Sequence, residues 1–221
     1  MKKALFLLLL FTGAIIAQEK GFYQEIPDSI GSLKFFELYK SFYANKKENP
    51  IKAHIYASAY LAKAKNENNT FFIAHGWILA ANLHEKEEVF LTYMDSIIRL
   101  TKVKNSKEFP ARAYLLKGDY FYRKQRFPEA LSNYSLASQF AMQKTNPRII
   151  YECNKAIGHI NSDLGLHKNA LRLFRESYEY ALDEEIVSEL EDLYFLSDEF
   201  NKLKFLDSAT YYNAIGIKKS K

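Results

Sequence analysis

The stretch KGDYFYRKQRFPEALSNYSLASQFA, from Lys117 to Ala141, places small residues at fixed distances from aromatic ones. Adding 40 to four of its positions gives residues of the same size class. The pairs are Gly118 with Gly158, Ala130 with Ala170, Tyr134 with Phe174, and Ala137 with Ser177. Self-similarity at a fixed period is the sequence signature of a repeat architecture. The stretch is therefore predicted to be one unit of a repeat.

Weaker copies of this unit occur on both sides. Subtracting 40 gives Phe90, Met94 and Ile97, which keep the apolar face but lose the small residues. Downstream, a spacing of 39 places Ala209 in the position of Ala170. Upstream, Ala53, Ala57 and Tyr60 fit the second half of a unit. Nearly the whole chain after the leader is thus predicted to be built from one repeated element.

Each unit has the pattern of two helices joined by a turn. Apolar residues recur at steps of three and four, as in Leu171, Phe174 and Tyr178, which is the period of an amphipathic helix. Prolines fall at predicted helix starts, where proline is tolerated. The predicted fold class is all-α, with about five helical hairpins at 32–66, 71–104, 109–144, 147–180 and 184–218. Residues 18–31 form a lead-in and 219–221 a basic tail.

The small residues have a packing explanation. Helices approach to about 8–10 Å only where their crossing points carry Gly, Ala or Ser. Large aromatic side chains then fill the space beside the crossing. One hairpin cannot bury its own apolar face, so the hairpins are expected to stack in a row.

Residues 1–17 have the layout of a secretory signal peptide. Lys2 and Lys3 precede an uncharged apolar run that ends at Ala17, shorter than the roughly 20 residues of a spanning helix. Cleavage after Ala17 or after Ala14 fits the pattern, and no Cys follows either site to carry a lipid. An uncleaved N-terminal anchor is the alternative. The expected location is the periplasm or the cell surface.

Charge and cysteine content argue against a nucleic-acid-binding protein and against a disulfide-stabilised one. The chain has 31 Lys and Arg against 26 Asp and Glu, so losing Lys2 and Lys3 lowers the net charge from +5 to +3. These charges are interspersed, which argues against a nucleic-acid partner. The one cysteine, Cys153, excludes an internal disulfide. No second apolar span follows the leader, so no membrane span is expected once it is removed.

The spacing Gly118, Ala130, Tyr134, Ala137 within a helix–turn–helix unit resembles the tetratricopeptide repeat family. Tyr114 and Phe121 match the aromatic positions of that pattern, and Gln125 matches its turn. The resemblance is clearest over 109–144 and 147–180. It implies a right-handed α-solenoid that binds proteins or peptides through a concave face. The period of about 40 is longer than the family's 34, and Asn154 stands where an aromatic residue is usual.

Phrases such as YLAKAKNENNT and LDSATYYN resemble exported repeat arrays of bacterial signalling proteins. In those proteins a membrane helix and a C-terminal DNA-binding domain follow the repeats. Neither follows here, so we expect a free-standing or truncated relative without DNA binding. The resemblance suggests a signal-transduction module whose output domain is on another chain.

Catalytic and metal chemistry find little support in the sequence. The five histidines lack the i, i+4 spacing of a zinc site, and no C-x-x-C motif occurs. His159 and His167 flank a turn near Asp163, but separate faces are expected. Cys153 is predicted to be a buried apolar residue rather than a nucleophile. No phosphate loop or nucleophile elbow occurs, so the chain is predicted to be non-enzymatic, without cofactor or metal.

The predicted binding surface lies on the first helix of each hairpin. The pattern leaves one set of residues free for a protein or peptide: Arg112, Asp119, Tyr122, Arg123, Lys155, His159, Tyr194 and Lys202. Glu152, Asp163 and Asp198 lie among them. Tyr and Arg often carry the energy of protein contacts. The plainer alternative is a solvated polar face.

In the first two units the corresponding positions are apolar: Phe35, Leu38, Phe42, Phe72 and Leu79. They form an apolar groove, or are covered by the lead-in segment 18–31 acting as a cap. The leading functional hypothesis is an exported scaffold that binds a protein or peptide. The alternatives are the sensory module described above and a hydrolase with a hidden site.

Overall fold

The computed structural model describes residues 26–103, 106–183 and 189–220. Eleven helices and no strand lie in these ranges, so the predicted all-α class is confirmed for them. The predicted leader 1–17 lies outside the described residues. The chain divides into two compact units, unit 1 up to Lys104 and unit 2 from Asn105 onward.

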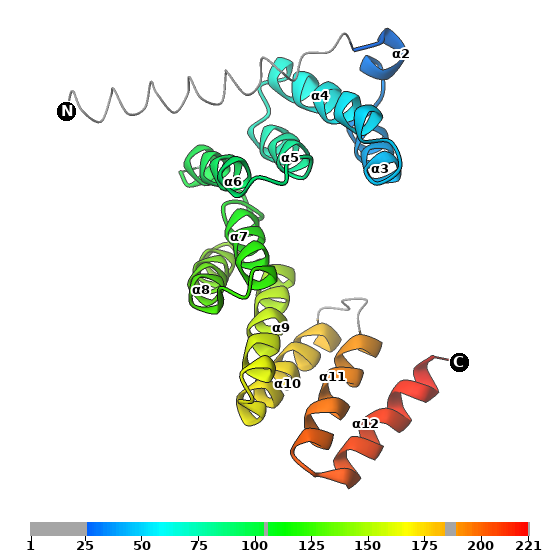
Figure 1. Ribbon diagram of the computed structural model, residues 1–221, viewed down its shortest axis with the longest axis vertical. Helices are drawn as coiled ribbons and strands as arrows, with labels where there is room; N and C mark the ends of the chain where they lie inside the picture. Colours follow the sequence, from blue (N-terminus) through cyan, green and yellow to red (C-terminus); the bar gives the residue numbers. More distant parts are fainter. Residues whose placement is uncertain (1–25, 104–105, 184–188, 221) are drawn as a thin grey trace, which may run out of the picture. The chain divides into compact units, whose positions relative to one another are not determined.

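The helices of unit 1 are α2 (Asp28–Gly31), α3 (Phe35–Asn45), α4 (Pro50–Asn66), α5 (Thr70–Ala81) and α6 (Glu87–Thr101). The helices from α3 to α6 pack consecutively, each on the next (Figure 1). The short helix α2 packs against α4. Leu38 and Phe42 of α3 are fully buried. Asn49 and Asn69 cap α4 and α5 by accepting hydrogen bonds from backbone N–H groups of the first turn.

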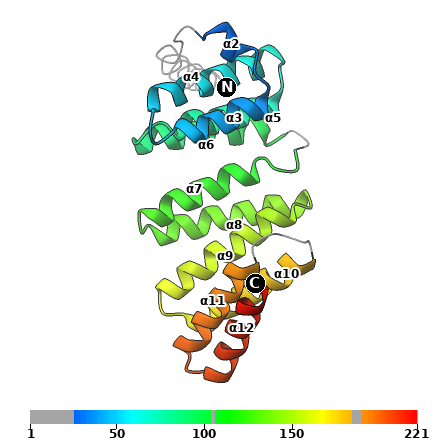
Figure 2. The same cartoon turned by 90° about the vertical axis from the view of Figure 1, so that its right-hand side faces the viewer.

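Unit 2 has the same order of consecutively packed helices (Figure 2). Its helices are α7 (Ala111–Arg123), α8 (Phe127–Gln143), α9 (Pro147–Asp163), α10 (His167–Asp183), α11 (Glu189–Lys202) and α12 (Leu206–Lys219). Consecutive helices pack on each other, and α7 also contacts α9. This contact brings the first helices of neighbouring hairpins together, which positions the candidate site.

The predicted crossing points are confirmed for two hairpins. A Cβ atom placed on Gly118 would lie 2.4 Å from the ring of Tyr134, and one on Gly158 would lie 2.7 Å from the ring of Phe174. Real Cβ atoms do not approach other atoms so closely, so α7 crosses α8, and α9 crosses α10, where a glycine leaves room for a ring. Ala130 and Ala170 beside these crossings are fully buried.

The hairpin turns repeat in backbone detail. Gln125, Gly165 and Lys204 have φ angles of 57°, 73° and 62°. In each turn the next residue donates its N–H to a carbonyl five positions earlier, at 2.9, 2.7 and 2.9 Å. This left-handed closure satisfies carbonyls that the end of a helix leaves open. The predicted turn position at Gln125 is confirmed, and it recurs after 40 and then 39 residues.

Candidate binding surface

The eight predicted binding residues all lie on the first helices of the hairpins in unit 2. Four come from α7, two from α9 and two from α11. The structure brings them together as a series of contacts between neighbouring first helices rather than as free side chains. Arg123 and Tyr194 are among the exposed residues of this set, and the charge of Arg123 acts on Asp119.

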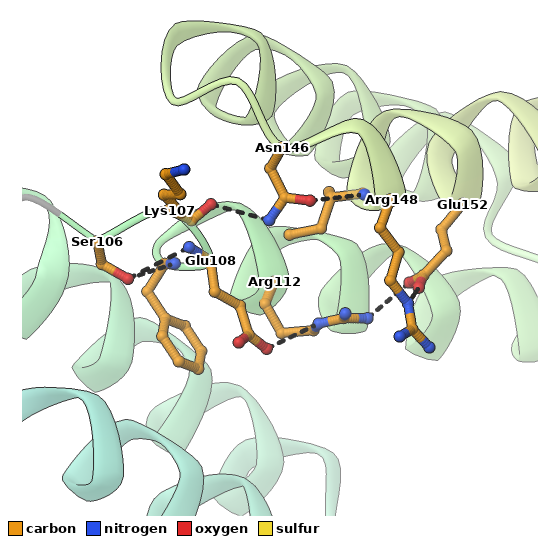
Figure 3. A network of polar contacts seen from close by, with 9 residues as sticks. Ser106, Lys107, Glu108, Arg112, Asn146, Arg148 and Glu152 are labelled. Atoms are coloured by element: carbon orange, nitrogen blue, oxygen red, sulfur yellow. Dashed lines mark hydrogen bonds and ion pairs between the residues drawn. The ribbon is translucent and has the colours of Figure 1, made fainter. Parts of the chain in front are cut away.

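Arg112 joins α7 to α9. Its guanidinium donates to Glu108 at 3.2 Å and to Glu152 of α9 at 2.6 Å. Arg148 also donates to Glu152, at 3.1 Å. Asn146 accepts from the N–H of Ile149 and donates to the carbonyl of Lys107. Asn146 thereby links the start of α9 to the segment that precedes α7 (Figure 3).

Asp119 and Tyr122 are also committed to contacts within unit 2. The Tyr122 hydroxyl donates to Asp163 of α9 at 2.8 Å. Burial and this hydrogen bond raise the pKa of Tyr122 to about 12. Asp119 accepts from the Tyr134 hydroxyl at 2.9 Å, across the hairpin. Burial raises the pKa of Asp119 in spite of that bond. Asp119 therefore lies partly inside the hairpin, whereas the sequence predicted it to be free.

Lys155 is the main link between α9 and α11. Its ammonium group pairs with Glu191 and, at 3.3 Å, with Asp192, whose side chain is 1% exposed. The Tyr151 hydroxyl donates to both oxygens of Asp192, at 2.9 and 2.8 Å. Burial raises the pKa of Asp192 against the opposing effect of Lys155. A buried charge of this kind is tolerated only when paired and hydrogen-bonded.

A second buried carboxylate, Glu199, lies about two turns further along α11. It accepts from Ser162 of α9 at 2.6 Å and from Lys202 at 2.8 Å, and it contacts Nδ1 of His167 at 3.0 Å. Burial acts to raise the pKa of Glu199, but these hydrogen bonds outweigh it and the pKa is lowered. Lys202 also pairs with Asp198 at 2.7 Å.

His159 packs among rings. The centroid of its imidazole lies 4.4 Å from the ring centroid of Phe195 of α11 and 5.1 Å from that of Phe174 of α10, and both contacts are edge-to-face. Burial, followed by the nearby Lys155 charge, lowers the pKa of His159. At neutral pH the ring is therefore uncharged and contributes packing.

The hydroxyl of Ser162, the amine of Lys202 and the thiol of Cys153 are hydrogen-bonded or buried. Ser162 donates its proton to Glu199 and accepts from Lys202 at 2.9 Å. The pKa of Lys202 is raised by its carboxylate partners, although burial opposes this, so it stays protonated and does not act as a base. Cys153 is buried, and burial raises the pKa of its thiol to about 12. The network holds helices together.

The described residues hold neither a cluster of metal-ligating side chains nor a helix that could span a membrane. No three or more His, Cys, Asp or Glu side chains converge there in a way that could hold a metal ion. In the same ranges no helix is long and apolar enough to cross a membrane.

The sequence prediction missed the buried partners Tyr151, Asp192 and Glu199. The repeat spacing of about 40 residues could have indicated these partners. Polar residues that contact each other between first helices are 36 to 41 positions apart, as in Arg112–Glu152, Tyr122–Asp163, Tyr151–Asp192 and Ser162–Glu199. A search for complementary polar pairs at this spacing would have found them.

Of the two alternatives for the apolar positions of unit 1, the exposed groove is wrong for three residues, while residues 18–25 of the alternative covering segment 18–31 lie outside the described residues. Leu38, Phe42 and Leu79 are fully buried. Phe35 and Phe72 stack on each other with ring centroids 3.9 Å apart. The exposed aromatic residues of α3 are instead Phe36, Tyr39 and Tyr43, each of which is adjacent in sequence to one of the predicted groove residues. The buried Phe42 lies 11 residues before the buried Ala53, whereas Gly118 lies 12 residues before Ala130, so the register of α3 differs by one residue from that of α7.

Comparisons of the chain with protein-family models, with curated proteins and with solved structures found no match.

Proposed function

We propose that this chain is an exported, non-enzymatic scaffold of the tetratricopeptide type, a right-handed α-solenoid that binds a protein or peptide. Its binding face in unit 2 is formed by α7, α9 and α11. The resemblance of the repeat spacing supports the family. The pattern of residues 1–17 supports export, to the periplasm or the cell surface.

One observation carries the binding proposal. Most polar side chains on this face hold each other between neighbouring first helices, while Arg123 and Tyr194 remain exposed, Tyr194 to 63%. A surface whose contacts are already made is preorganised, so a partner loses little side-chain entropy there. Tyr and Arg are also the side chains most often found as energetic anchors in protein interfaces.

The test begins with affinity capture of a partner from a periplasmic extract, followed by titration with purified variants. The double variant Arg123→Ala and Tyr194→Ala should bind at least about tenfold more weakly, with an unchanged free energy of unfolding. Tyr211→Ala, which removes an equally exposed Tyr from α12, is the matched control and should keep full affinity. Unchanged affinity in the double variant would refute the use of this face.

A further inference from the structure

Helix α3 of unit 1 carries an exposed aromatic row. Phe36 is 74% exposed, Tyr39 40% and Tyr43 43%. Their spacing of three and four residues places them on one face of the helix. Leu38 and Phe42 on another face are fully buried. Such grouped exposure of large apolar side chains marks interaction surfaces more often than single exposed residues do. We call Phe36, Tyr39 and Tyr43 the α3 stripe.

The α3 stripe occupies the helix face that corresponds to the face of the proposed binding residue Tyr194 on α11. Moving 155 residues back from α11, the buried Leu193 and Ser197 fall on the buried Leu38 and Phe42. The same shift carries three less buried residues onto the α3 stripe: Glu191 onto Phe36, Tyr194 onto Tyr39, and Asp198 onto Tyr43. Units 1 and 2 thus use equivalent faces, one aromatic and the other charged.

The charges beside the α3 stripe are positive and unpaired. Lys40 lies one turn after Phe36 on α3, and Lys47 lies two residues beyond the end of α3 at Asn45. Neither makes an ion pair or side-chain hydrogen bond within the described ranges, in contrast to Lys155 and Lys202 of unit 2. The one acid of α3, Glu37, accepts the backbone N–H of Lys34 at 2.7 Å and so closes the start of the helix. Among the described residues, no carboxylate forms an ion pair with either lysine.

Contacts at both ends of α3 hold the α3 stripe in place. Phe35 stacks on Phe72 of α5, and the Lys46 ammonium donates to Asn82 at 3.1 Å near the other end of α3. Tyr39 and Tyr43 also contact each other, with ring centroids 4.8 Å apart. Because α3 is fixed to α5 at both ends, the three rings are presented with little freedom to lose on binding.

We propose that the α3 stripe binds an acidic amphipathic helix of a partner protein. The stripe spans two helical turns, about 10 Å, which matches a row of apolar side chains at i, i+3 and i+7 on a partner helix. Carboxylates flanking that row pair with Lys40 and Lys47. This inference goes beyond the proposed function, because it concerns other residues in the other unit and another kind of anchor.

The probes are two fluorescein-labelled helical peptides of about four turns. Both carry the same leucine row, flanked by Glu in one and by Lys in the other. Fluorescence anisotropy with the full chain should give a Kd near 10 µM for the Glu peptide, and at least about tenfold weaker binding for the Lys peptide. Binding of the Glu peptide should weaken with added salt, because the lysines are exposed.

Two variants and one control locate the site. Phe36→Ser with Tyr39→Ser should abolish binding of the Glu peptide, and Lys40→Glu with Lys47→Glu should weaken it about tenfold. Tyr211→Ser on α12 should change nothing. Equal binding of the two peptides, or equal losses in the stripe variant and Tyr211→Ser, would overturn the proposal. So would failure of the Glu peptide to bind while phosphatidylglycerol vesicles bind in a stripe-dependent way, which would indicate a membrane surface.

Accessibility is measured separately. Tyr39→Cys and Tyr211→Cys should react with a maleimide at similar rates, since native Cys153 is buried and its raised pKa keeps it unreactive. Reaction of Tyr39→Cys more than about tenfold slower than that of Tyr211→Cys would mean that another part of the chain covers the stripe, and would also overturn the proposal.

Discussion

Left-handed backbone at hairpin turns is the clearest residue-scale feature of unit 2. Of the three equivalent turn residues only Gly165 is a glycine, while Gln125 and Lys204 adopt positive φ with a side chain. A residue with a Cβ loses about 1–2 kcal/mol in this conformation relative to its right-handed state. Gln125→Gly should therefore raise the free energy of unfolding by about 0.5–1 kcal/mol, measured by urea denaturation.

The neighbouring Lys124 is the matched control for the turn. Its φ of −89° is open to any residue. Lys124→Gly should leave stability unchanged or lower it, since glycine then only adds freedom to the unfolded chain. Equal stabilisation by both substitutions would show that φ at Gln125 is not the cause.

Ser177 is a second residue at which substitution by its counterpart in another repeat is expected to raise the free energy of unfolding. Its hydroxyl is buried without a hydrogen-bond partner, and the equivalent residue 40 positions earlier is Ala137, which is equally buried. Burying an unpaired hydroxyl costs about 1–3 kcal/mol. Ser177→Ala should raise the free energy of unfolding by about 1 kcal/mol, and Ala137→Ser should lower it. A loss of stability in Ser177→Ala would indicate a partner for the hydroxyl.

At the scale of elements, α11 is fixed by two buried carboxylates seven residues apart, Asp192 and Glu199, each 1% exposed. Both face α9. The folded-state pKa of Glu199 is lowered below its ordinary value. Its stabilising effect is then fully present above the unfolded-state pKa and is lost as the pH falls through the folded-state pKa.

Replacing Glu199 tests this contribution. Glu199→Gln should lower the free energy of unfolding by about 1–3 kcal/mol at pH 7, because it removes charge-assisted hydrogen bonds from Lys202 and Ser162. The difference from the parent protein should shrink as the pH is lowered past about 4, measured by urea unfolding at each pH. Glu176→Gln, which removes an exposed pair with Arg172, should cost under about 0.5 kcal/mol at every pH. A difference that grows in acid would contradict the lowered pKa.

The repeat period predicted backbone features better than side-chain contacts. Gly118 and Gln125 were predicted correctly because a helix crossing and a hairpin turn each demand a residue type that the period preserves. The partner of a charged side chain depends on which rotamer faces the next helix, and the sequence holds no direct record of that. Lys155 was therefore named as a free binding residue, although it pairs with Asp192.

The prediction for unit 1 failed for a different reason. There the repeat is degenerate, so the register of α3 had to be extrapolated from unit 2. The buried Phe42 lies 11 residues before the buried Ala53, where the first hairpin of unit 2 has 12 between Gly118 and Ala130. The exposed face falls on Phe36 and Tyr39. On a helix one position is about 100°, which exchanges a buried face for an exposed one.

On the scale of the whole molecule, the chain is two compact units rather than one. In arrays of stacked helices, stability is close to a sum of local terms, so damage in one place need not unfold the rest. Substitution of Gly158 would disrupt packing locally in unit 2, because a Cβ atom there would lie 2.7 Å from the Phe174 ring. Overpacking of this kind costs about 1–3 kcal/mol.

Gly158→Ala should accordingly lower hydrogen-exchange protection in α9 to α12 by about tenfold or more, and leave α3 to α6 nearly unchanged. The control is Gly216→Ala in α12, where the nearest atom to an added Cβ is 3.9 Å away. It should keep or increase protection, since alanine favours the helix by about 1 kcal/mol. If Gly158→Ala instead reduced protection equally in both units, the two units would unfold together. The division of the chain would then be one of packing alone and not of stability.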